Sequence, residues 1–158
     1  MATYQTDYST EYMPIGIQGQ IANEEKHNQI SRTVETADGI PYGAPCQRGA
    51  EDHGADLYTT GDFLGLAVLT AAVPPAASGA NPDSFPLDFT LPIMTQGTMY
   101  VEVGGAVNAG DAVFYDAANN RFNAAAVGAE TALPSCVFDT SAAAAGDIAE
   151  ISIKHRSF

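Results

Sequence analysis

The sequence contains few basic residues, and this shortage limits the partners that the protein can have. Six Lys and Arg residues stand against 19 Asp and Glu, so the net charge is −13. Nucleic acids and anionic membrane surfaces attract clusters of Lys and Arg, and we therefore expect neither as a partner. This acidity is typical of a soluble chain whose copies repel one another. The alternative is that the negative charge steers the protein toward a basic partner.

The chain also lacks tryptophan, a cysteine framework and long apolar runs. Its two cysteines, Cys46 and Cys136, have no Cys-x-x-Cys or Cys-x-His neighbours. This spacing predicts two free thiols in semi-buried strands and synthesis in a reducing compartment. Residues 1–8 show neither the basic nor the apolar segment of a signal peptide. No apolar run approaches the roughly 18 residues that span a bilayer.

What the sequence does contain is a series of short apolar runs separated by turn residues. They recur every 8–15 residues or so, a spacing typical of a small β-barrel or β-sandwich. We therefore predict an all-β fold with long loops, in which residues 34–158 form a single domain. An exposed loop is expected at residues 73–86, and either a short helical turn or a loop of small residues at 140–146. The predicted strands cover residues 40–47, 63–69, 87–94, 98–103, 111–115, 121–123, 136–138 and 148–153.

Residues 1–33 differ from the rest, because their aromatic and aliphatic residues are dispersed among polar residues and glycines. This pattern predicts an extended N-terminal arm, with a loop or frayed strand over residues 24–38. Tyrosine is common among interface anchors, so we expect the arm to pack on a neighbouring molecule. The candidate interface residues are Tyr4, Tyr8, Tyr12, Met13, Ile15 and Ile17.

No segment shows the residue pattern of a catalytic site. His27, His53 and His155 all lie in polar or terminal contexts, and no serine lies in a nucleophile motif. The best cation candidate is Glu51, Asp52 and His53, but it lacks the spacing of zinc or calcium sites and is expected to form a hydrated turn. We therefore predict no catalytic residue, no metal, no cofactor and no enzymatic activity.

Four motifs, in order along the chain, resemble those of the structural cement or head-decoration proteins of tailed bacteriophages. They are residues 15–22 (IGIQGQIA), 39–43 (GIPYG), 63–68 (FLGLAV) and the hairpin-like block 95–115. Tyr100 stands where an aromatic residue is usual in that block. The insertion at residues 73–88 departs from the family pattern.

The resemblance implies that the protein binds the outer surface of a phage capsid after synthesis in the host cytoplasm. It would stabilise the capsid by bridging major capsid protein subunits, as a homo-oligomer in which a trimer is favoured over a dimer. One alternative is another virion component, such as a tail, baseplate or fibre-head module. A second alternative is a small metal-dependent or polysaccharide-acting enzyme, for which residues 51–53 are the only support.

Overall fold

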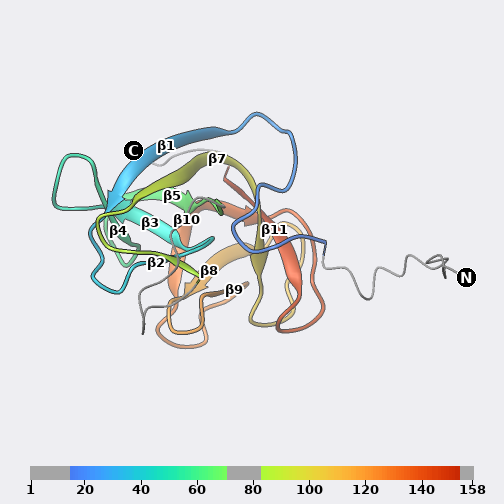
Figure 1. Ribbon diagram of the computed structural model, residues 1–158. Coiled ribbons are helices and arrows are strands. Elements are labelled where there is room, and N and C mark those ends of the chain that lie inside the picture. Colours follow the sequence, from blue (N-terminus) through green and yellow to red (C-terminus); the bar gives the residue numbers. More distant parts are fainter. Residues whose placement is uncertain (1–14, 71–82, 154–158) are drawn as a thin grey trace, which may run out of the picture.

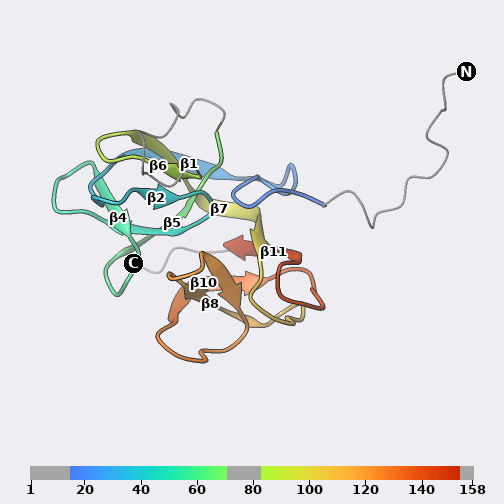
Figure 2. The ribbon, with the colours of Figure 1, turned by 60° about the horizontal axis from the view of Figure 1, so that its bottom comes forward.

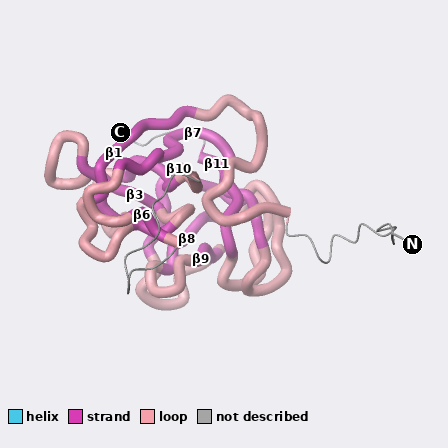
Figure 3. The backbone as a smooth tube through the Cα atoms, in the orientation of Figure 1, coloured by secondary structure: helices cyan, strands magenta, loops and turns pink. Residues whose placement is uncertain are grey.

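The computed structural model describes residues 15–70 and 83–153, and in these ranges the chain consists of strands and loops without a helix (Figure 1 and Figure 3). The predicted all-β fold is therefore confirmed. Among the described residues there is no helix long and apolar enough to cross a membrane. The strands are β1 (Asn28–Val34), β2 (Ile40–Pro41), β3 (Pro45–Arg48), β4 (Gly54–Leu57), β5 (Phe63–Ala67), β6 (Ser84–Phe85), β7 (Thr90–Glu102), β8 (Ala112–Asp116), β9 (Arg121–Asn123), β10 (Thr131–Phe138) and β11 (Ile148–Ile153).

Five strands close into a barrel in the order β1-β4-β3-β5-β7, with β7 pairing again with β1. The β1–β4 pair is parallel, and the other pairs are antiparallel. A short sheet of β2 and β6 lies outside this ring. The β1–β4 pairing that closes the ring is short, since it joins only Thr33 to Gly54 and Val34 to Ala55.

A second sheet continues from the same long strand, in the order β7-β11-β10-β8-β9. The first half of β7 pairs with β1 and β5, and its last six residues, 97–102, pair with β11. Figure 2 shows the two parts one above the other, with β7 running from one to the other. A bridge between Val103 and Phe122 brings β9 back beside the end of β7.

The continuous β7 differs from the sequence prediction, which divides it into two strands at Gly97. The glycine lies inside the strand with φ +133°, and an added Cβ would lie 2.7 Å from Cβ of His27. It therefore lets β7 pass from one part to the other instead of ending it. Pro92, read as an edge marker, also lies in a strand that is paired on both sides.

β1 occupies residues that the sequence analysis places in a loop or frayed strand and largely in the arm. Its segment NQISRTV is mostly polar, and only Val34 is fully buried. The strand is held by its pairing with β4 and β7 rather than by its own apolar residues. Tertiary pairing thus decides the structure where local pattern is weak.

One continuous cluster of buried side chains fills both parts. It consists mainly of Val, Ile, Leu, Phe, Met and Tyr residues, as expected from the composition. Cys46 and Cys136 are buried in it as free thiols, which confirms that prediction. The largest fully buried side chains are Tyr115, Phe85, Phe122 and Phe138.

Candidate functional site

The first described residues, 15–22, lie along the second half of β7, and we call this segment the arm root. Hydrogen bonds of 2.9–3.0 Å join Gly19 N to Tyr100 O, Tyr100 N to Gln20 O and Ala22 N to Thr98 O. Ile21 and Met99 form an antiparallel bridge. The arm root is thus tied to the strand that both parts of the fold share.

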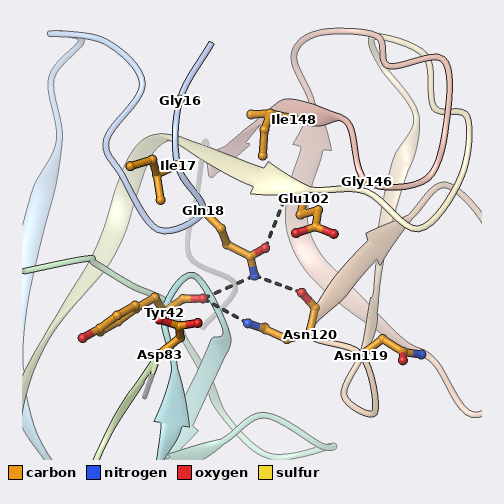
Figure 4. A pocket seen from close by; sticks show the side chains of 10 residues that line it. All are labelled: Gly16, Ile17, Gln18, Tyr42, Asp83, Glu102, Asn119, Asn120, Gly146 and Ile148. Atoms are coloured by element: carbon orange, nitrogen blue, oxygen red, sulfur yellow. Dashed lines mark hydrogen bonds between the residues drawn. The ribbon is translucent and has the colours of Figure 1, made fainter. Parts of the chain in front are cut away.

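The side chain of Gln18 forms hydrogen bonds with both parts of the fold and so links the arm root to each of them (Figure 4). Its Nε2 donates to the backbone carbonyl of Tyr42 at 3.3 Å and to that of Asn120 at 3.0 Å. Its Oε1 accepts the backbone N–H of Glu102 at 3.2 Å. Tyr42 follows β2, Asn120 lies in the β8–β9 turn and Glu102 ends β7, so one amide holds three distant segments together.

Asn120 completes this network from the turn between β8 and β9. Its Nδ2 donates to Tyr42 O at 3.3 Å, and its Oδ1 accepts the hydroxyl of Tyr115 at 3.0 Å. The residue has φ +50°, a conformation that Asn tolerates better than most residues. Burial raises the pKa of Tyr115, so its hydroxyl remains a hydrogen-bond donor at neutral pH.

Glycines allow the close backbone approach that this site needs. Gly19 has φ +86°, and an added Cβ would lie 2.9 Å from the backbone nitrogen of Gly43. A Cβ at Gly16 would lie 2.2 Å from the ring of Tyr100. The arm root therefore lies on residues of the 39–43 motif and of the 95–115 block, so these motifs of the sequence meet in space.

The predicted interface residues fall in two groups. Tyr4, Tyr8, Tyr12 and Met13 lie outside the described residues. Ile15 and Ile17 are 72% and 61% exposed on the arm root. They are two of the four large hydrophobic residues that are exposed in the described part of the chain.

A pocket of about 430 Å³ opens beside the arm root, and Figure 4 labels the residues that line it. Its wall includes Ile17, Gln18 and Ile148, together with the carboxylates of Asp83 and Glu102. None of the ten described residues that line it is a histidine, cysteine, serine or lysine. With the carboxylates of Asp83 and Glu102 in its wall, the pocket offers negative charge and shape for binding.

The charges around the pocket are mostly negative. Glu102 Oε1 accepts Nε of Arg121 at 2.8 Å and also contacts its Nη2 at 2.5 Å. The side-chain hydrogen bond from Asn119 is the main cause that holds the pKa of Asp116 below its usual value. Burial and then the charge of Asp83 raise the pKa of Tyr42, which keeps that phenol protonated at neutral pH.

The acidic segment at residues 51–53, the best cation candidate in the sequence, forms the exposed turn between β3 and β4. Glu35 organises this turn, because its carboxylate accepts the N–H groups of Ala50 at 2.7 Å and Glu51 at 3.0 Å. A Cβ at Gly49 or Gly54 would collide with that carboxylate. Within residues 15–70 and 83–153, no group of three or more His, Cys, Asp or Glu side chains could hold a metal ion.

Sequence reasoning identified the exposed isoleucines of the arm root but missed Gln18, Asn120 and the pocket. The glycines on either side of Gln18 were visible in the sequence, and they indicate close packing around that residue. The partners of its side chain were not visible, because they lie 24, 84 and 102 residues further along the chain.

Comparison with known proteins finds a matching family model and solved structures with a similar fold. A family model described as "Structural cement protein (E217 gp24/Pam3 gp6)" matches residues 4–154. A chain in the solved structure "The capsid of Myoviridae Phage XM1" is similar in fold, with a TM-score of 0.68 and 16% identity, over 99% of this chain and 100% of that chain. No curated protein sequence matches.

Proposed function

Because this chain belongs to the structural cement protein family of phages, and is thus a structural protein of the virion capsid, we propose that it binds the outer surface of the capsid and bridges major capsid protein subunits. The family resemblance inferred from the sequence is confirmed by the match to residues 4–154. Synthesis in the host cytoplasm, action without catalysis and assembly as a homo-oligomer, with a trimer favoured over a dimer, are parts of the same proposal.

The observation that carries this proposal is the exposure of Ile15 and Ile17 on a firmly held arm root. Backbone hydrogen bonds to β7 and the side chain of Gln18 fix the segment that follows them. An exposed apolar side chain on a fixed backbone loses little conformational entropy when a partner covers it. Together with the tyrosines that precede them in the sequence, these residues suit an anchor on a repeated protein surface.

A lattice of capsid subunits also explains how modest contacts become effective. Each copy that touches two subunits, or that is joined to other copies, makes its second contact at a high effective concentration. Symmetric oligomers would present equivalent arms to equivalent subunits. The proposal therefore needs each anchor to bind only moderately well.

The test is a deletion of residues 1–17, which removes the arm up to and including both isoleucines but leaves Gln18 in place. Full-length and shortened proteins are added to capsids that lack them, and occupancy is measured by cryo-electron microscopy. We expect the shortened protein to remain folded by circular dichroism and to lose capsid binding. Unchanged occupancy would remove the arm from the proposal, and binding of neither form would contradict the proposal itself.

A pair of substitutions separates the isoleucines from the rest of the arm. Ile15→Ser with Ile17→Ser is compared with Val127→Ser, which changes another apolar residue, 86% exposed, in the β9–β10 loop. We expect the isoleucine pair to lower occupancy and Val127→Ser to leave it unchanged. Multi-angle light scattering of the same samples measures the oligomer number.

A further inference from the structure

We propose that the pocket beside the arm root receives a lysine or arginine side chain of a major capsid protein subunit. This inference rests on the proposed function. It adds a charged contact in the pocket to the apolar contacts that the arm makes with the capsid. The experiment below separates its failure from failure of the proposed function.

The pocket is built by segments that lie far apart in the sequence. Ile17 and Gln18 come from the arm root, Asp83 from the chain before β6, Glu102 from the end of β7 and Ile148 from the start of β11. Its volume of about 430 Å³ lies within the range of 300–1,000 Å³ or so that is usual for ligand pockets. The hydrogen bonds of Gln18 and Asn120 hold the segments around it in place, so the pocket is present before a partner arrives.

The lining matches a side chain with an aliphatic stem and a cationic end. Ile17 and Ile148 supply apolar surface, and Asp83 and Glu102 supply negative charge. Long basic side chains bind in this way, with the methylene groups on apolar surface and the charge beside acceptors. Figure 4 shows the isoleucines above the amide of Gln18 and the carboxylate of Glu102 beside it.

Arg121 does not use all of the charge available at Glu102. Both of its contacts run to Oε1 of that carboxylate, which leaves Oε2 for a second donor. A carboxylate can accept two cationic donors at once. No lysine, arginine or histidine is among the described residues that line the pocket.

Charge balance favours a capsid subunit over a second copy of this chain as the source of the cation. The sequence has six bases and 19 acids, and its copies repel one another. Of the four bases among the described residues, Arg121 is already paired with Glu102. A basic group on the capsid would also draw this acidic protein to the lattice, because complementary charges raise association rates.

The test compares two pairs of substitutions that change net charge equally. Asp83→Asn with Glu102→Gln removes the charge of the pocket, and Glu24→Gln with Asp38→Asn removes two exposed charges elsewhere. Binding to purified capsids that lack the protein is measured over a series of salt concentrations, with thermal unfolding as the check on folding. We expect the pocket pair to bind at least tenfold more weakly at low salt and with a shallower salt dependence, and the control pair to stay within twofold of the unchanged protein.

A third variant makes the test independent of the loss of Glu102. Asn119→Arg places a guanidinium of the chain itself on the exposed turn at the pocket, where it should compete with the incoming cation and weaken binding.

The outcomes separate the two proposals. Equal binding by the pocket and control pairs, or unchanged binding by Asn119→Arg, overturns the inference and leaves the proposed function standing. A pocket pair that loses self-association but not capsid binding assigns the pocket to a second copy, which also overturns it. Absence of binding by the unchanged protein contradicts the proposed function.

Discussion

The side-chain amide of Gln18 donates a hydrogen bond of 3.0 Å to the backbone carbonyl of Asn120, which lies 102 residues further along the chain. The same side chain also reaches the backbone of Tyr42 and Glu102. A single uncharged side chain thus adds three long-range hydrogen bonds to the backbone hydrogen bonds that hold the arm root on β7.

Replacing Gln18 by alanine should lower the free energy of unfolding by about 2 kcal/mol, because three part-buried hydrogen bonds are lost and water replaces them only partly. Denaturant unfolding followed by circular dichroism measures this change. Gln20→Ala is the matched control, since the Gln20 side chain accepts only the exposed N–H of Ile17 at 3.3 Å. Equal effects of the two substitutions would show that Gln18 has no special part in holding the segment.

Gly65 in β5 should not tolerate a side chain. Its φ is +153°, and an added Cβ would lie 2.0 Å from the backbone oxygen of Met94 in the neighbouring β7. We expect Gly65→Ala to lower the free energy of unfolding by about 3 kcal/mol or more, because the β5–β7 pair must move apart. At Gly105, an added Cβ would meet no atom of the described residues within 4 Å, apart from its chain neighbours. Gly105→Ala should therefore change the free energy of unfolding by less than about 0.5 kcal/mol. Chemical denaturation of both variants distinguishes these outcomes.

The turn at residues 49–53 should depend on Glu35 rather than on its own acidic residues. Glu35→Ala removes the acceptor of two backbone N–H groups and should cost about 1–2 kcal/mol of stability. The triple substitution of Glu51, Asp52 and His53 by alanine should leave the melting temperature nearly unchanged. Calcium or zinc should not raise the melting temperature of either form, and a rise that the triple substitution removes would reveal a cation site there.

The two buried thiols should make the fold less stable in alkali. Burial raises the pKa of Cys136 to about 12 and raises that of Cys46 as well. In the unfolded chain a thiol has a pKa of about 8.5, so above that pH the unfolded state loses protons that the folded state keeps. The stabilising contribution is complete below that pH and falls by about 1.4 kcal/mol per pH unit for each thiol as the pH rises toward 12.

Unfolding free energies measured between pH 8 and 11 test this slope. Substitution of both cysteines by alanine should reduce the slope, whatever its effect on stability at pH 7. An identical slope in the cysteine-free protein would mean that other groups cause the alkaline loss.

The parts of the structure that were predictable are those whose signal is local. Buried β5 was visible as the apolar run at residues 63–69, and β8 and β9 as the predicted strands at residues 111–115 and 121–123. β1 was not visible, because its polar residues are held by pairing with β4 and β7. Gly97 misled the prediction, because a glycine that ends one strand and a glycine that bends a longer one look the same in sequence.

The same distinction holds for the site. Ile15 and Ile17 were selected as interface candidates from residue type and a position near the chain end, and this role stays a prediction. The pocket could not be predicted, since its two carboxylates, Asp83 and Glu102, lie in different elements and only folding brings them to one opening. The motifs at residues 15–22, 39–43 and 95–115 pointed to this part of the chain, but they did not show how its side chains are arranged.

The antiparallel course of the arm root along β7 bears on how the protein responds to a pull. The hydrogen bonds between the two segments are perpendicular to the strand axis, so a force on Ile15 along that axis strains all of them together in shear. A force perpendicular to the strand axis would break these hydrogen bonds one after another. β7 is hydrogen-bonded to β1 and β5 in one part and to β11 in the other, so it would spread an axial tension over the whole body of the molecule.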